Sequence, residues 1–202
     1  MYIVILGVLW VYHFLVISVS TQSLKYKDVG NQTNFHFENC NRSATPFYVQ
    51  LLKLYPDPIN LQMGVMRLSI EFSLERDVGK DNNRIDVDLN WRLKTSEGYT
   101  ELCDIIGENN CHFNDLCAEL KKIMDRAPNT CPAFMKEKYH NNCSCPFLKN
   151  DYTVHKVPIF FKSLPIQLRG TFDLTINLQE QGTHVGCVRI EFCITDCTPL
   201  GG

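Results

Sequence analysis

The ten cysteines of this 202-residue chain are the residues whose type and spacing could most readily do chemistry. Zinc sites and thiol–disulfide exchange both use cysteine pairs in the CxxC pattern, and the chain has no such pair. The closest pairs are Cys143 with Cys145, in the stretch HNNCSCPF, and Cys193 with Cys197. The spacing therefore favours structural disulfides over a metal centre or a redox site, and we expect no cofactor.

Residues 1–20 indicate the compartment in which such disulfides form. They are apolar almost throughout and end in Ser-Val-Ser, a pattern of small residues that signal peptidase cleaves. We expect a removed signal peptide, passage through the oxidising secretory pathway, and a lysosomal or extracellular protein. No Lys or Arg precedes the apolar run, so a retained membrane anchor is the alternative. Sequons at Asn31 and Asn41 are the predicted glycosylation sites.

Charge and motifs argue against several classes of function. The net charge of −2 provides no basic field for nucleic acid. The GxSxG, HExxH and phosphate-binding glycine motifs are absent from the sequence. The nearest approaches to a catalytic group are His112 with Asp115, which we expect near a helix start, and Asp86 with Asp88, which we expect on the wet face of a strand. We therefore do not expect an enzyme.

Strict alternation of apolar and polar residues predicts the strands. Apolar side chains occupy every second position over residues 66–75 and again over 85–94, and the residues between them are turn formers that predict a hairpin loop. Residues 172–178 and 188–194 alternate in the same way on either side of a Gln181-Gly182 turn. Three weaker strand candidates lie at 35–40, 47–54 and 152–161.

Residues 103–147 interrupt this pattern and hold six of the ten cysteines. Apolar side chains from Phe113 to Met124 follow helical spacing, which predicts one short helix that Pro128 ends, with loops around it. The chain as a whole predicts an all-β fold, an antiparallel two-sheet sandwich or cup with one helical excursion tied by disulfides. We expect a polar tail at 21–34, one domain at 35–197 and a short tail at 198–202.

Strand periodicity also suggests one disulfide. Phe35 and Phe37 lie on the apolar face of their strand, so Cys40 points to the opposite face. Cys187 likewise points away from the face that carries Val188. A bond between Cys40 and Cys187 would therefore join the first and last strands on their outer surface.

Several stretches of the sequence match one family together. They are FHFENC at 35–40, LYPDPINL at 54–61, ELCDIIGENNCHFNDLC at 101–117, NNCSCPF at 141–147 and GCVRI at 186–190. With the order and spacing of eight cysteines, they resemble the GM2 ganglioside activator family, the sphingolipid-activator branch of the ML lipid-recognition superfamily. The resemblance runs from about Phe35 to Ile194, nearly the whole chain after residue 34.

This resemblance implies a set of disulfide pairs. The family pattern, carried onto the matching positions, gives Cys40–Cys187, Cys103–Cys111, Cys117–Cys145 and Cys131–Cys143. Cys193 and Cys197 have no counterpart in that pattern, and we expect a fifth bond between them. A free thiol and a covalent dimer are the alternatives.

The resemblance also implies that the two sheets form an immunoglobulin-like cup around an apolar lipid cavity. A period-two apolar face is the same whether it meets an acyl chain or another sheet, so a packed core is the alternative. The candidate wall residues of the cavity are Leu89, Trp91, Phe172, Leu174, Ile190 and Phe192.

Residues 156–168 are the expected mouth of that cavity. Pro158 and Pro165 break regular pairing, and Lys156 and Lys162 accompany an apolar run suited to an anionic membrane surface. The candidate membrane-contacting residues are Ile159, Phe160, Phe161, Leu164, Ile166 and Leu168. The family carries a tryptophan in this loop that the present chain lacks. A strand followed by a buried connection is the alternative.

The function implied by the resemblance is that of a secreted or lysosomal lipid-binding and transfer protein. It would extract a (glyco)sphingolipid from a membrane and present it to a hexosaminidase-type glycoside hydrolase, as a non-catalytic activator. One alternative is a phospholipid or sterol carrier without an enzyme partner. The other is a secreted, disulfide-rich interaction protein with a filled core.

Overall fold

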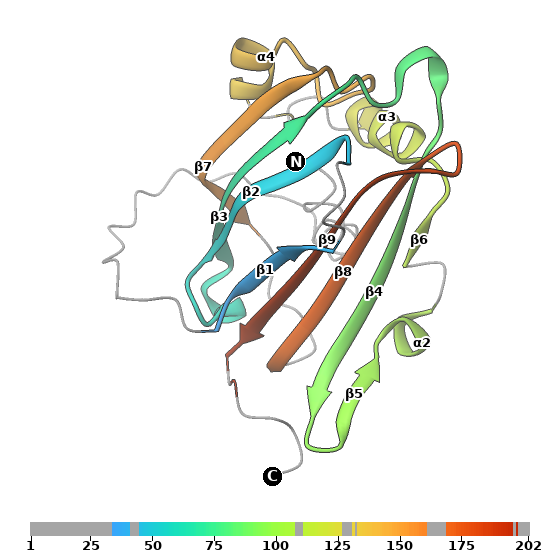
Figure 1. The fold of residues 1–202 in the computed structure, drawn as a ribbon. Helices are drawn as coiled ribbons and strands as arrows, with labels where there is room; N and C mark the ends of the chain where they lie inside the picture. Colours follow the sequence, from blue (N-terminus) through green and yellow to red (C-terminus); the bar gives the residue numbers. More distant parts are fainter. Residues whose placement is uncertain are drawn as a thin grey trace.

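The computed structural model describes residues 34–40, 45–107, 111–126, 131, 133–160, 169–195 and 197, which form two facing antiparallel sheets with short helices (Figure 1). The strands are β1 (His36–Asn39), β2 (Phe47–Tyr55), β3 (Val65–Leu74), β4 (Ile85–Thr95), β5 (Gly98–Glu101), β6 (His112–Phe113), β7 (Asn150–Phe160), β8 (Gly170–Glu180) and β9 (Thr183–Ile194). The helices are α2 (Cys103–Ile106), α3 (Leu116–Arg126) and α4 (Ala133–Tyr139), with 3-10 turns η1 (Leu61–Met63) and η2 (Lys80–Asn82).

The larger sheet has the strand order β1-β9-β8-β4-β5, with β6 also paired to β4, and the smaller sheet has the order β2-β3-β7. This confirms the predicted all-β, two-sheet antiparallel fold. The three weaker strand candidates form β1, β2 and β7, which are edge strands of their sheets. An edge strand is covered on fewer sides than a central one, so its apolar alternation is less regular.

The predicted hairpin between residues 66–75 and 85–94 is wrong. β3 pairs with β2 and β7 in the smaller sheet, whereas β4 pairs with β8 in the larger one. The connection crosses between the sheets, where the backbone of Val78 pairs with that of Phe147 and the Gly79 N–H donates to Glu180 Oε1 at 2.7 Å. Alternation identifies the buried face of a strand but does not identify its neighbour.

The predicted turn between β8 and β9 is confirmed. Gln181 has φ 50° and Gly182 has φ 76°, so both central residues of this two-residue connection are left-handed. That combination is a type I′ turn, whose twist matches the twist of the flanking strands.

The predicted helix is confirmed as α3. It begins at Leu116 and not at Phe113, which lies in β6. Leu116 and Leu120 are completely buried, and Asp115 Oδ1 accepts a hydrogen bond from the Ala118 N–H at 3.1 Å, which caps the helix start.

The expectation that loops fill the rest of residues 103–147 is wrong at α2 and α4. In α4, Met135 and Tyr139 lie four residues apart and are both buried, and the Tyr139 hydroxyl donates to the Thr153 carbonyl of β7 at 3.1 Å. Two apolar residues at helical spacing do not stand out as a period in the sequence. The helix depends on what it packs against.

Five disulfide bonds hold the fold, and they join Cys40–Cys187, Cys103–Cys111, Cys117–Cys145, Cys131–Cys143 and Cys193–Cys197. These are the pairs named above. Cys117–Cys145 ties α3 to the segment before β7, at the end of the sandwich where β2, β4 and β9 begin. We call this the closed end, at the top of Figure 1, and the opposite end, where β4 turns into β5, the rim end.

Candidate functional site

The six candidate wall residues lie together on the inner face of the larger sheet. They are Leu89 and Trp91 of β4, Phe172 and Leu174 of β8, and Ile190 and Phe192 of β9. The register places Trp91 opposite Leu174 and Leu174 opposite Ile190. The Phe172 ring stacks on that of Phe192 at 5.6 Å and lies 6.2 Å from that of Trp91. Residues that are far apart in the chain thus form one continuous apolar surface.

Coverage of this surface decreases along β4. Ile85 and Val87 are each 1% exposed and Leu89 is 8% exposed, whereas Trp91 and Leu93 are only partly buried. These five side chains share one face of the strand, so the difference reflects what lies over them. Along β4 the inner face is thus covered completely at the closed end and incompletely at the rim end, whereas Phe172 of β8, which pairs with Leu93, is only 1% exposed.

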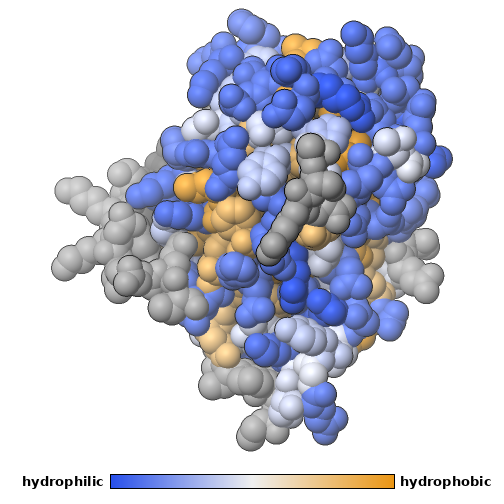
Figure 2. All heavy atoms as spheres, in the orientation of Figure 1, coloured by the Kyte–Doolittle hydropathy of each residue, from blue (hydrophilic) through white to orange (hydrophobic). Residues whose placement is uncertain are grey.

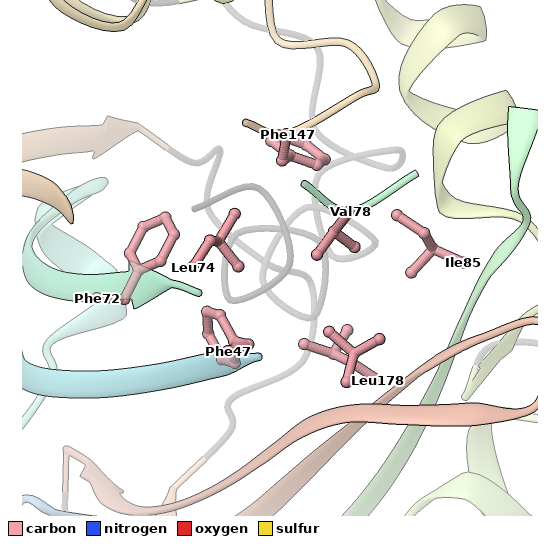
Figure 3. Close-up of a pocket in the computed structure, with 8 residues that line it drawn as sticks. Phe47, Phe72, Leu74, Val78, Ile85, Phe147 and Leu178 are labelled. Atoms are coloured by element: carbon pink, nitrogen blue, oxygen red, sulfur yellow. The ribbon is translucent and has the colours of Figure 1, made fainter. Parts of the chain in front are cut away.

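A small cavity lies at the closed end (Figure 3). It is lined by Phe47, Phe72, Leu74, Val78, Ile85, Phe147, Leu178 and Val185, and its volume is about 20 Å³. That volume holds about one water-sized sphere, and an acyl chain does not fit in it.

The expected mouth segment is not a loop throughout. Residues up to Phe160 belong to β7, where Ile159 pairs with Met66 and is 8% exposed. Pro158 is tolerated in this strand because β7 is an edge strand of its sheet. Ile159 is therefore a core residue, which corrects its assignment to a membrane-contacting loop, and Phe160 is the last strand residue. The other four candidates of this segment, Phe161, Leu164, Ile166 and Leu168, lie outside the described residues.

Comparison with models of protein families matches residues 34–194 to the ML domain. The chain belongs to the ML domain family. Similar solved structures include a Niemann-Pick type C2 protein from Japanese carpenter ant, at 12% identity over 79% of this chain and 99% of that one, with a TM-score of 0.38. Chicken MD-1, complexed with lipid IVa, is similar at 12% identity over 81% of this chain and 92% of that one, with a TM-score of 0.36. Comparison with curated proteins found no match.

Three exposed apolar side chains lie around the rim end of this ML domain. Met63 of η1 is 45% exposed, Tyr99 of β5 is 44% exposed and Ile105 of α2 is 69% exposed. Figure 1 places η1, β5 and α2 in the lower half of the molecule, and Figure 2 shows apolar side chains reaching the surface between polar ones on this face. Sequence reasoning missed these residues, because single apolar residues in short elements have no period.

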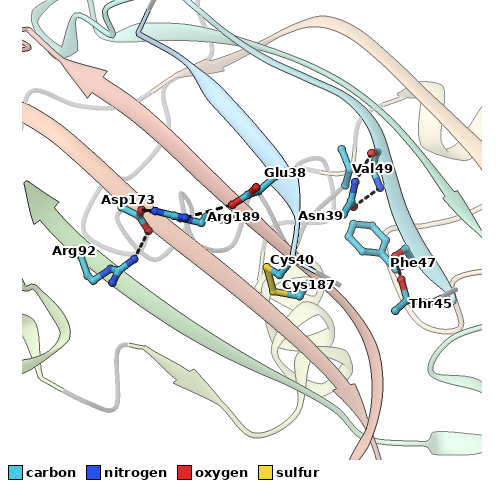
Figure 4. The surroundings of a disulfide bond; sticks show 10 residues. All are labelled: Glu38, Asn39, Cys40, Thr45, Phe47, Val49, Arg92, Asp173, Cys187 and Arg189. Atoms are coloured by element: carbon cyan, nitrogen blue, oxygen red, sulfur yellow. Dashed lines mark hydrogen bonds and ion pairs between the residues drawn. A yellow bond between two sulfur atoms is a disulfide. The ribbon is translucent and has the colours of Figure 1, made fainter. Parts of the chain in front are cut away.

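A chain of charged side chains crosses the outer face of the larger sheet (Figure 4). Asp173 of β8 is completely buried and accepts hydrogen bonds from Arg92 Nη2 at 3.0 Å and from Arg189 Nε at 2.8 Å. Arg189 Nη1 also reaches Glu38 Oε1 of β1 at 3.3 Å. Burial by itself would raise the pKa of Asp173, but the two arginines outweigh it and hold that pKa below its ordinary value.

This charged chain fixes the strands of the larger sheet from outside. It links β1, β9, β8 and β4, and the Cys40–Cys187 bond joins β1 to β9 at the same edge. Neither contact depends on what fills the space between the sheets.

His112 and Asp115 lie near the start of α3, as expected, and they have different partners. His112 Nδ1 forms an ion pair with Asp88 across β6 and β4, and its Nε2 is 2.7 Å from Asn114 Oδ1, while Asp115 caps α3. The hydrogen bond with Asp88 raises the pKa of His112. The His112 and Asp88 side chains are 48% and 42% exposed, which is the setting of a surface ion pair.

Among the residues that the structure describes, no group of three or more His, Cys, Asp or Glu is arranged to hold a metal ion. Within the same residues, no helix is long and apolar enough to cross a membrane. The predicted signal peptide, both tails except Asn34, and the predicted glycosylation sites Asn31 and Asn41 lie outside the described part of the chain.

Proposed function

We propose that this ML domain binds a lipid between its two sheets, with the hydrocarbon against the inner face of the larger sheet and the headgroup beyond the rim end. The observation that carries this proposal is the loss of coverage along β4, from 1% exposure at Ile85 to partial exposure at Trp91 and Leu93. Each methylene that enters such a site contributes about 0.8 kcal/mol. Eight methylenes would contribute about 6 kcal/mol, enough to withdraw a lipid from water.

We propose further that the protein is a non-catalytic activator of the ganglioside-activator type. It would extract a (glyco)sphingolipid from an anionic membrane and present the headgroup to a hexosaminidase-type hydrolase, in the lysosome or outside the cell. The stretches from FHFENC to GCVRI and the order of the cysteines support this finer assignment. The exposed Met63, Tyr99 and Ile105 would add apolar contact with the membrane at the rim.

The test of lipid binding is native mass spectrometry of the secreted, non-reduced protein, followed by organic extraction and lipid analysis. A near-stoichiometric co-purifying lipid, on a protein lighter by ten hydrogens than its reduced form, is the expected result. A protein that carries no lipid and takes up neither ganglioside nor phospholipid from liposomes would refute the proposal. The filled-core interaction protein would then be the better assignment.

A second experiment separates an activator from a carrier. Ganglioside in liposomes is incubated with a lysosomal β-hexosaminidase, with and without the protein, and released hexosamine is measured. An activator increases hydrolysis of the membrane-bound lipid but leaves hydrolysis of a water-soluble substrate unchanged. Transfer of phospholipid or sterol between liposomes without any effect on hydrolysis would instead identify a carrier.

A further inference from the structure

The indole N–H of Trp91 is a buried hydrogen-bond donor without an acceptor. The Nε1 atom is inaccessible to solvent, and none of the described residues accepts a hydrogen bond from it. The indole N–H can only donate, so it has no second way to be satisfied. Buried polar groups in folded proteins nearly always have a partner, and an orphan costs the folded state free energy. Such a group calls for an explanation.

The orientation of the Trp91 ring is the reverse of the usual one. The side chain as a whole is only partly buried, so part of the ring reaches solvent. A tryptophan in this situation ordinarily turns its N–H to water and buries its carbon edge. Here the N–H is the covered part, so the donor is turned away from solvent.

The described residues around Trp91 provide no substitute acceptor. Its side chain packs against the core, opposite Leu174 and beside the Phe172 ring. Both of these neighbouring side chains are apolar. The Trp91 carbonyl is already occupied, because it accepts the Leu102 N–H at 2.7 Å. Trp91 lies two residues along β4 from Leu89, which is 8% exposed. It is the first inner-face residue of β4 that is only partly buried.

We propose that Trp91 donates this hydrogen bond to a carbonyl oxygen at the junction between the acyl chain and the headgroup of the bound lipid. This inference rests on the proposed lipid-binding function. A hydrocarbon chain that extends toward the closed end leaves its polar junction near the rim end, at the level of Trp91. The ligand class is then a lipid with an ester or amide carbonyl at that junction, such as a glycerolipid or an N-acyl sphingolipid. A dialkyl ether lipid lacks the acceptor.

The experiment compares three lipids that share a phosphocholine headgroup and have matched chain lengths. They are diacyl phosphatidylcholine with ester carbonyls, dialkyl ether phosphatidylcholine with none, and sphingomyelin with an amide carbonyl. The wild-type protein is expected to bind the ester or the amide lipid about three- to tenfold more tightly than the ether lipid, the range of one net hydrogen bond. The Trp91→Phe variant keeps an aromatic ring and lacks the N–H, so it should bind all three lipids equally.

The outcomes separate this inference from the proposed function. Equal affinity of the wild-type protein for all three lipids, or an ester or amide preference that survives in Trp91→Phe, would overturn the role of Trp91 and leave lipid binding standing. Binding of none of the three would also overturn it, and the lipid content of the secreted protein then decides separately on the proposed function. A preference confined to sphingomyelin would assign the acceptor to an amide.

A second measurement does not depend on the variant folding. The chain has two tryptophans, Trp10 in the predicted signal peptide and Trp91, so few indole signals arise. In ¹⁵N-tryptophan-labelled wild-type protein, the Trp91 indole proton should move downfield on addition of the ester or amide lipid and less on addition of the ether lipid. The same shift with all three would count against the proposal.

Discussion

Asn39 of β1 and Val49 of β2 belong to different sheets and exchange two hydrogen bonds (Figure 4). Asn39 Nδ2 donates to the Val49 carbonyl at 2.8 Å, and the Val49 N–H donates to Asn39 Oδ1 at 3.0 Å. The side-chain amide thus takes the place of a neighbouring strand on the free edge of β2. Farther along β9, the N–H of Ile59, in the connection between β2 and β3, donates to the Cys193 carbonyl at 2.8 Å. The two sheets are therefore joined along this side independently of the inner face.

Replacement of Asn39 by Ala should destabilise the fold by about 1–3 kcal/mol, because both partners on Val49 lose their hydrogen bonds. Asn39→Asp keeps an acceptor for the Val49 N–H but removes the donor and places a charge against the carbonyl. It should not restore the stability of the wild type. Urea unfolding with the disulfides intact measures both effects, and an unchanged midpoint for Asn39→Ala would show that this junction contributes nothing.

The Cys40–Cys187 bond should contribute more to stability than the Cys193–Cys197 bond. Their sequence separations are 147 and 4, and the chain-entropy model gives about 5 and about 2 kcal/mol for loops of those lengths. Thermal unfolding of two double variants, Cys40→Ser with Cys187→Ser and Cys193→Ser with Cys197→Ser, provides the comparison. Equal losses would contradict the entropic explanation.

Asp173→Asn should destabilise the protein by about 2–3 kcal/mol at neutral pH, because it leaves Arg92 and Arg189 without their buried counter-charge. The pKa of Asp173 is lowered in the folded state. Its stabilising contribution is therefore present above about pH 4, the unfolded value, and is lost as the pH falls through the folded pKa. The stability difference between wild type and Asp173→Asn should shrink toward pH 2–3. A difference that stays constant with pH would refute this assignment.

The His112–Asp88 ion pair should stabilise the fold more at acidic than at alkaline pH. The pKa of His112 is raised, so its contribution is complete below about pH 6.5, the unfolded value, and is lost as the pH rises through the folded pKa. His112→Gln should lower the melting temperature more at pH 5.5 than at pH 8.5. In an Asp88→Asn background this pH dependence of the His112→Gln effect should largely disappear, and its persistence would point to another partner.

Leu93 and Lys94 offer a matched test of the inner face, since neighbouring strand residues point to opposite faces. Leu93→Gln places an amide among the partly buried apolar side chains at the rim end and should reduce lipid uptake about tenfold or more. Lys94→Gln on the outer face should leave uptake unchanged. Extraction of fluorescent lipid from liposomes measures both, and equal effects would place the lipid elsewhere.

The inner faces of β4, β8 and β9 could be predicted from the sequence, whereas β5, β6 and the site built on the sheet could not. Leu89, Trp91, Phe172 and Ile190 were identified because alternation depends on residues that follow one another in the chain. The same pattern placed β3 and β4 in one hairpin, since both have one dry face and nothing local distinguishes their partners. The Asp88–His112 pair was also missed, since its members come from strands 24 residues apart.

The sequence by itself determined the class of fold, the longer strands and their buried faces, and the cysteine pattern that resembles the family. These features are encoded by side chains within a few positions of one another. The tertiary structure alone decided which strands are neighbours apart from β8 and β9. It also decided that α4 forms, how far the inner face is covered, and that the Trp91 N–H lacks an acceptor among the described residues. Those properties depend on contacts between distant residues, which the free energy of the whole fold selects.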